Sequence, residues 1–362
     1  ARPDAGMGAV LDATALLNSR QIACPEDWIL DQHRLKNGTA VFPGTGYLDM
    51  AASSLYREGA KGPVELRDIV FSAPLAVGPG ERWEVACQQR EDNGQKRFRI
   101  QARETGHGTW REYASGSTEV HEPSQRSRTA IRALRARCKE RDVDFSARPT
   151  RQEQYFDFGP RWRCLKRMHF GAGEALAELE LPSRFAADLR NCFLHPSLLD
   201  LATGCSLYLI PEYLEAGSVS VYLPMSYERV KIWDRLPARI YSHIRSRRGN
   251  SLYKEMAVFD ITITDEDGAI LVEIEGFGLR KVADAAALAL EQPAPASLPA
   301  GRGIPRQEGG DAFLRLLAWS EPAPGVIVTP EPPAAQQAVR ANPAIRGAAP
   351  TGVSSGWTDI ES

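Results

Sequence analysis

The sequence has few of the features that mark a membrane, secreted or metal-binding protein. No apolar run approaches the roughly 18 residues that a spanning helix needs, and the start has no basic segment leading into an apolar one. The six cysteines form no Cys-x-x-Cys pair and no cluster with histidine at the spacing of a zinc site. We therefore expect a cytoplasmic protein with free thiols, no metal and no membrane contact.

Several common catalytic signatures are also missing. There is no Gly-x-Ser-x-Gly elbow and no phosphate-binding P-loop, and the stretches GTGYLD and GAGEAL do not fit the dinucleotide fingerprint. The formal net charge of the 362 residues is only −2, so no strong field favours nucleic acid as a partner. Hydrolase, nucleotide-binding and redox functions lose support, and the residues imply no cofactor.

The hydrophobic pattern indicates two similar halves. In the first half, Leu48, Ala51, Ala52 and Leu55 recur at i, i+3, i+4 and i+7, which predicts a helix after the sequence PGTG. In the second half, HPSLLDLATGCSLYLI has the same period, and alternating strand-like segments follow both helices. One helix and several antiparallel strands in each half predict two α+β units packed side by side.

These patterns divide the chain into four segments. We expect the first half over residues 1–120, a basic linker over 121–151, the second half over 152–284, and a further linker over 285–362. The basic segment predicts a solvated linker or surface helix, with a docking face for an acidic partner as the alternative. The last segment is rich in Pro, Ala and Gly, which disfavours independent folding, although DAFLRLLAW predicts a short helix.

Two titratable residues stand beside the two predicted helices. His33 precedes the first helix, and Asp200 lies on the first turns of the second. An imidazole can accept a proton near neutral pH, whereas a carboxyl group in apolar surroundings can stay protonated and donate one. One base and one acid from two halves suit an elimination. Taken alone, such a histidine is more often structural, and such an aspartate is more often a cap or surface residue.

Five motifs occur in order between residues 20 and 284. They are DQHRLKNGTAVFPGTGYLDMA, YFDFGPRW, HPSLLD, LPMSY and GFGLRKV. Each is weak alone, but the ordered set resembles the dehydratase domains of modular polyketide synthases. The resemblance implies a double hot-dog fold, in which two antiparallel sheets each wrap around a central helix and pack side by side.

The resemblance also implies a reaction, in which a 3-hydroxyacyl chain on the phosphopantetheine arm of an acyl carrier protein loses water. His33 would remove the C2 proton, and Asp200 would protonate the C3 hydroxyl, leaving a 2,3-enoyl thioester. The backbone N–H of Gly44 is the candidate donor to the thioester carbonyl. No metal or diffusible cofactor is implied. The residues expected to line the substrate tunnel are Pro43, Phe158, Gly159, Pro160, Gly204, Leu223 and Pro224.

Three departures from the family pattern stand at the candidate site. Four residues separate His33 from Gly38, where the family usually has three, so the histidine keeps its direction only if KNG forms a wider turn. Gly204 replaces the Gln or His that commonly follows Asp200 by four residues and orients its carboxyl group. Phe158 stands where a tyrosine is frequent.

The departures leave related activities open, namely a double-bond shift along the chain or closure of an oxygen ring after dehydration. Asp200 favours dehydration, because an isomerase has less need of an acid, while Gly204 would open space for ring closure. A non-catalytic remnant that docks the carrier protein or holds a dimer is expected only if His33 and Asp200 do not converge on one tunnel.

The segment after residue 300 adds a prediction about partners. GIPRQEGGDAFLRLL and PGVIVTPE resemble the region that follows ketoreductase domains in polyketide synthases. We therefore expect a far longer native polypeptide, with neighbouring synthase domains as partners and a homodimer as a possible assembly.

Overall fold

The structure, a computed structural model, describes residues 19–282 apart from residues 93, 107, 211–212, 214–220, 248 and 252–253. The predicted helix DAFLRLLAW and the linker over 285–362 lie outside the described residues. The helices are α2 (Trp28–Asp31), α3 (Gly44–Arg57), α4 (Ile131–Arg137) and α5 (Pro196–Gly204), with 3-10 turns η1 (Arg151–Gln154), η2 (Pro160–Trp162), η3 (Ser183–Arg190) and η4 (Cys205–Leu209).

The strands fall into two groups along the chain. Those of the first half are β1 (Ser19–Ala23), β2 (His33–Leu35), β3 (Ala40–Phe42), β4 (Val64–Phe71), β5 (Leu75–Val77), β6 (Arg82–Asp92), β7 (Gln95–Glu104) and β8 (Arg111–Val120). Those that follow are β9 (Arg141–Asp144), β10 (Phe156–Phe158), β11 (Leu165–Gly171), β12 (Glu174–Glu180), β13 (Val221–Ile232), β14 (Arg239–Ser246), β15 (Met256–Thr264) and β16 (Ile270–Val282).

The first half is built around α3, as its apolar period predicts. Leu48, Ala51, Ala52 and Leu55 are all buried, and the helix packs on β4, β6 and β7. The turn-rich stretch EDNGQ between two alternating segments predicts a hairpin, and the register of β6 and β7, which pairs Asp92 directly with Gln95, confirms it. The alternating apolar residues of these strands therefore face the helix and close the core.

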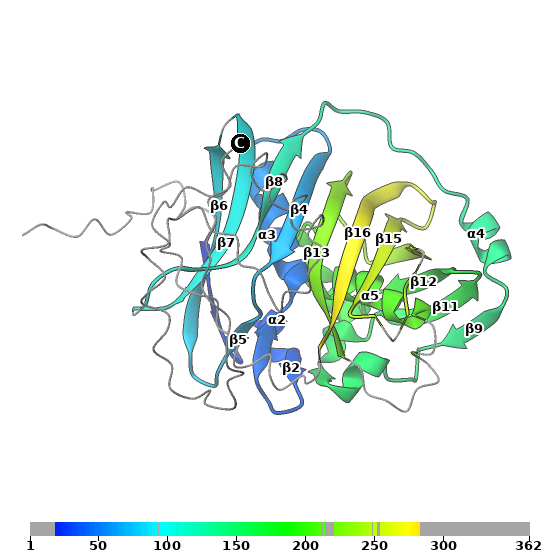
Figure 1. The fold of residues 1–362 in the computed structure, drawn as a ribbon, viewed down its shortest axis with the longest axis horizontal. Helices are drawn as coiled ribbons and strands as arrows, with labels where there is room; N and C mark the ends of the chain where they lie inside the picture. The colour runs from blue at the N-terminus through cyan, green and yellow to red at the C-terminus, as the bar shows by residue number, and fades with distance from the viewer. Residues whose placement is uncertain are drawn as a thin grey trace, which may run out of the picture. The chain divides into compact units, whose positions relative to one another are not determined.

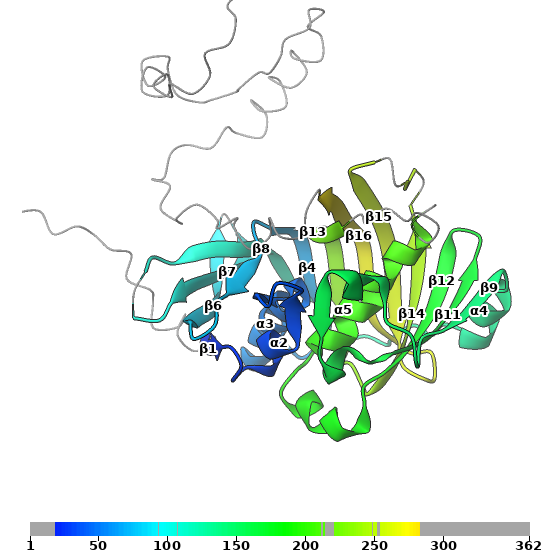
Figure 2. The same ribbon diagram turned by 90° about the horizontal axis from the view of Figure 1, so that it is seen from below.

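The second half repeats this arrangement around α5. Leu198, Leu201, Ala202 and Cys205 are buried, while Leu209 is half-buried at the end of η4. Together α5 and η4 pack on β12 and β14. Figure 2 shows α3 and α5 next to each other on the same side of the strands, and the two helices are in contact.

The sheets of the two halves join edge to edge. Strand β4 pairs antiparallel with β13, with Val64 opposite Ile232. The order β1-β6-β7-β8-β4-β13-β16-β15-β14-β12-β11-β9 thus forms a continuous 12-stranded sheet in the described part of the chain (Figure 1). The double hot-dog fold is confirmed, with its two sheets fused through one shared pair of strands.

A second, four-stranded sheet has the order β10-β2-β3-β5. Strand β10 comes from the YFDFGPRW motif of the second half, yet it pairs antiparallel with β2 of the first half, so that Phe158 lies opposite His33. This sheet therefore carries two motifs that are far apart in the sequence to one place.

The basic segment 121–151 contains structure of its own. It forms the surface helix α4, and its strand β9 pairs with β11, so part of the expected linker extends the sheet of the second half. Arg135 and Arg137 form ion pairs with Glu178 and Glu174 of β12. These charges are thus partly neutralised within the protein, which weakens the case for a docking face. Among the described residues, no helix has the length and apolarity required to span a membrane.

Candidate active site

A cavity of about 490 Å³ is lined by residues of both halves. Its wall includes His33 from β2 and Asp200 from α5. The volume falls within the range of sites that enclose small molecules. The two titratable residues that the sequence singles out therefore face one common space.

The two side chains lie close together, with Nε2 of His33 4.0 Å from Oδ2 of Asp200. The extra residue after His33 is absorbed in the turn, where the N–H of Leu35 donates to the carbonyl of Thr39 and Gly38 has a φ of +88°. Such a φ is open to glycine and rarely to other residues. Residues 36–38 thus form the turn between β2 and β3, and His33 at the start of β2 faces the cavity.

The tautomer of His33 follows from its hydrogen bond. Nδ1 lies 2.6 Å from the carbonyl oxygen of Val41. Because a carbonyl oxygen only accepts, Nδ1 must carry the proton, and Nε2 of the neutral ring has a free lone pair. Burial lowers the pKa of His33, although the charge of Asp200 and the bond to Val41 oppose this shift. The environment therefore favours a neutral imidazole that can act as a base.

Asp200 has the complementary environment. Burial raises the pKa of its carboxyl group, although His33 and a hydrogen bond from Trp162 oppose this shift. The indole Nε1 of Trp162 donates to Oδ2 of Asp200 at 2.8 Å. Trp162 is the last residue of the YFDFGPRW motif, but the sequence pattern assigned it no role; the structure shows that it holds the carboxyl group that the missing side chain at Gly204 cannot hold.

The start of α5 is fixed by α3. Oδ1 of Asp49 accepts hydrogen bonds from the backbone N–H groups of Phe193 and Leu194, both at 2.8 Å. The hydroxyl of Thr45 donates to the carbonyl of Pro196 at 3.1 Å. These bonds join the helix that begins at the cavity to the helix that carries Asp200, so the first half sets the position of the acid.

Gly44 is the first residue of α3 and lines the cavity. Its N–H has no acceptor within the helix, because the first N–H groups of any helix are unpaired. A Cβ at this position would lie 2.8 Å from Cε2 of Phe71. The close packing of Phe71 therefore favours glycine at the position of the candidate N–H donor.

Four of the seven expected tunnel residues line the cavity, and three do not. Pro43, Phe158, Leu223 and Pro224 belong to its wall. Phe158, which replaces the more frequent tyrosine, has its ring 5.5 Å from the His33 ring and stacked on it.

Gly159, Pro160 and Gly204 lie outside the cavity wall, so the expectation for them is wrong. Gly159 packs against Gln32, whose Cγ would be 2.4 Å from an added Cβ, and Pro160 is exposed at the start of η2. Gly204 is buried, and the side chain of Gln152 covers it.

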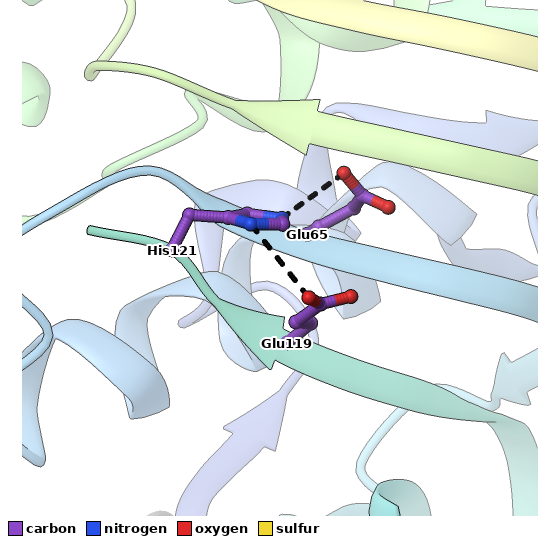
Figure 3. A group of neighbouring side chains, drawn as sticks. All are labelled: Glu65, Glu119 and His121. Carbon is purple, nitrogen blue, oxygen red and sulfur yellow. Dashed lines mark hydrogen bonds and ion pairs between the residues drawn. The ribbon is translucent and has the colours of Figure 1, made fainter. Parts of the chain in front are cut away.

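A separate cluster of Glu65, Glu119 and His121 lies outside the cavity, on β4 and at the end of β8 (Figure 3). Nε2 of His121 is 3.2 Å from Glu65, and Nδ1 is 3.7 Å from Glu119. Arg67 and Arg229 also pair with Glu65, at 2.5 and 3.4 Å. Two guanidinium groups thus neutralise this site, which acts as an ion-pair network between β4 and β13 rather than as a cation site.

Comparison with models of known families shows to which family the chain belongs. The model described as "Polyketide synthase dehydratase N-terminal domain" matches residues 123–289, and "Polyketide synthase dehydratase domain" matches residues 9–103. The chain belongs to the polyketide synthase dehydratase family. The five ordered motifs lie within the two matched regions, and these regions correspond to the two halves of the double hot-dog.

Curated relatives are much longer than this chain. Polyketide synthase PksM of Bacillus subtilis is 23% identical over 269 residues, which cover 70% of this chain and 6% of that protein. Polyketide synthase ThaG of Burkholderia thailandensis is 27% identical over 262 residues, which cover 67% of this chain and 4% of that protein. This chain thus spans a small part of the length of these relatives, which are large polyketide synthases.

Solved structures share the fold. A trans-AT polyketide synthase dehydratase domain from Brevibacillus brevis has a TM-score of 0.63 at 24% identity and covers 73% of this chain and 93% of that one. The dehydratase domain from the CurF module of curacin polyketide synthase has a TM-score of 0.62 at 23% identity, with coverages of 73% and 92%. Both confirm the dehydratase-type double hot-dog.

Proposed function

We propose that this protein removes water from a 3-hydroxyacyl thioester carried by an acyl carrier protein and forms a 2,3-enoyl thioester. The observation that carries the proposal is the 4.0 Å approach of His33 Nε2 to Asp200 Oδ2 in one cavity. Two similar structures are inactive variants of the CurK dehydratase, one with a histidine replaced by phenylalanine and one with an aspartate replaced by asparagine. The inactivity of these variants supports the importance of the same two residue types.

The proton balance of the reaction fits the two environments. The free lone pair on Nε2 of His33 takes the C2 proton, and the electrons of that C–H bond form the C2–C3 double bond. The C3–O bond breaks as protonated Asp200 gives its proton to the departing hydroxyl, which leaves as water. His33 then carries a positive charge beside the Asp200 carboxylate, and proton return within this pair restores the starting state.

The thioester oxygen gains negative charge as the C2 proton leaves. The N–H of Gly44 stands at the N-terminus of α3, a helix of 14 residues whose dipole is positive at this end. A backbone donor at the cavity wall stabilises such charge without moving. Gly44 therefore completes a set of base, acid and oxyanion donor.

The proposed carrier arm contains a phosphate group beyond the thioester. Arg280 and Lys281 of β16 line the same cavity and supply cationic groups that can meet this phosphate. The proposed partners are therefore an acyl carrier protein and the neighbouring domains of a synthase. A homodimer and a cytoplasmic location stay predictions.

The sequence left three alternatives open, namely a non-catalytic remnant, isomerisation and ring closure. The remnant hypothesis required that His33 and Asp200 fail to converge, and they converge. Isomerisation and ring closure use the same base, and GphF DH1, another member of this fold, is the parent of a variant described as isomerase-inactive. The retained acid, held by Trp162 and facing the cavity, favours dehydration over isomerisation.

Intact-protein mass spectrometry tests the proposal with carrier protein that bears a 3-hydroxyacyl chain, with and without a remote hydroxyl. Loss of one water is expected with wild type and not with His33→Ala or Asp200→Asn. His121→Ala and Asp157→Asn are matched controls, because both residues lie outside the cavity wall. A new ring seen by chromatography would add cyclase activity. Shift of a 2,3-enoyl chain without any dehydration would replace the proposal by isomerase activity.

A further inference from the structure

We propose that Trp162 is a positioning residue that decides which oxygen of Asp200 carries the acid proton. This inference rests on the proposed dehydration and deepens it. The indole Nε1–H donates to Oδ2 at 2.8 Å, and Trp162 is only 2% exposed. An indole nitrogen donates and cannot accept, so Oδ2 must be the acceptor. When the carboxyl group is protonated, its proton is therefore placed on Oδ1.

Oδ1 is the oxygen that remains for the substrate. Among the described residues, it has no hydrogen-bond partner, and the Asp200 side chain, which lines the cavity, is 19% exposed. A proton on this oxygen is available to a hydroxyl group in the cavity, whereas a proton on Oδ2 would point toward the indole. Trp162 thus directs the acid toward the leaving group.

The surrounding structure fixes the position of the Trp162 indole. The backbone N–H of Trp162 donates to the carbonyl of Gly159 at 3.0 Å within the turn that starts η2. Its ring stacks on Phe158, with 5.9 Å between centroids and 13° between planes. The His33 ring lies 5.3 Å away. One side chain therefore contacts both proposed reacting groups, and it fixes the acid relative to the base.

The other groups that face Asp200 provide little competing charge. They are His33 from β2, Cys164 before β11, Cys205 of η4 and Tyr227 of β13. Burial favours the neutral form of each, since it lowers the pKa of His33 and raises the pKa of both thiols and of the phenol. The Trp162 N–H is consequently the uncharged donor that stabilises the Asp200 anion, and its removal will raise the pKa of Asp200.

The test compares Trp162→Phe with Trp233→Phe. Trp233 is a matched control, because its Nε1 also donates to a carboxylate, that of Glu273 at 2.7 Å, but lies outside the cavity wall. We expect Trp162→Phe to lower kcat at neutral pH by about tenfold or more with little change in KM, because a hydrogen bond to a charged group is lost. In Trp162→Phe, the limb on which kcat falls with rising pH will also move to higher pH. Trp233→Phe will leave kcat and the position of this limb unchanged.

A second pair of measurements separates this inference from the proposed reaction. Replacement of Trp162 by benzothienylalanine keeps the ring shape and removes only the N–H donor, so it answers the test if phenylalanine impairs folding. Infrared titration of the Asp200 carboxyl band, assigned with Asp200→Asn, reports its pKa without turnover. An upward shift in the benzothienyl variant supports the inference even if no dehydration occurs. An unchanged band and an unchanged pH limb would overturn it.

Discussion

The carboxamide of Gln152 occupies the place of a side chain at Gly204. A Cβ added to Gly204 would lie 2.5 Å from Nε2 of Gln152. Gln152 belongs to η1, where Thr150 and Glu153 form a capping box, and it lines the cavity. The expectation that Gly204 opens space near the acid is therefore wrong, because an amide from another element fills that space. This weakens the steric argument for ring closure.

This relationship predicts a compensating pair of substitutions. Gly204→Ala alone is expected to lose, by displacing the flexible Gln152 carboxamide, most of the roughly 1 kcal/mol of stability that alanine gains over glycine in a helix. In Gly204→Ala with Gln152→Ala, the clash is absent and most of that stability returns. Denaturant unfolding of the wild type, both single variants and the double variant measures the coupling. Additive effects would show that the two side chains do not share this space.

The hydrogen bonds that Asp49 accepts predict that its replacement will strongly lower the stability of the fold. Asp49→Ala leaves the buried N–H groups of Phe193 and Leu194 without their acceptor and is expected to cost about 2–5 kcal/mol. Asp49→Asn keeps an oxygen at the same position and is the matched control, with a smaller loss. Thermal unfolding compares them, and activity should follow the same order, since α5 carries Asp200. Equal losses in both variants would refute the role of the acceptor oxygen.

Asp49 also predicts a pH dependence of stability. Burial raises the pKa of its carboxyl group from 3.8 to about 6. The folded protein thus binds this proton more tightly than the unfolded chain. The stabilisation that protonated Asp49 gives the fold is therefore fully present below pH 3.8 and is lost as pH rises to about 6. The difference amounts to roughly 3 kcal/mol. The free energy of unfolding, measured across this pH window, should decline with rising pH in wild type, and this decline should be absent in Asp49→Asn. Parallel curves would exclude Asp49 as its source.

Local patterns in the sequence predicted much of this architecture. The period of Leu48, Ala51, Ala52 and Leu55 marked α3, because a helix buries one face whatever its partner is. The turn between β6 and β7 was equally readable, since a hairpin depends on adjacent residues. His33 and Asp200 were found because their motifs are ordered along the chain, and the structure places them 4.0 Å apart.

The supporting contacts could not be read in this way. Trp162 and Asp200 are 38 residues apart, and Asp49 and Leu194 are 145 residues apart. Such bonds exist only after the halves have packed, and no periodic pattern encodes them. The three-residue strand β10 is likewise defined by its pairing with β2 rather than by its own sequence. The residues that orient the site are therefore less visible than those that react.

Gly44 offers a test that separates packing from catalysis. A Cβ at this position would lie 2.8 Å from Cε2 of Phe71, so Gly44→Ala must shift the start of α3 or the phenyl ring. We expect a stability loss of about 1–3 kcal/mol and at least tenfold lower kcat, since the N–H donor moves with the helix. Gly44→Ala with Phe71→Leu makes room for the new methyl group. If the double variant recovers stability and activity together, packing alone demands glycine. If stability returns and activity does not, the methyl group itself obstructs the thioester.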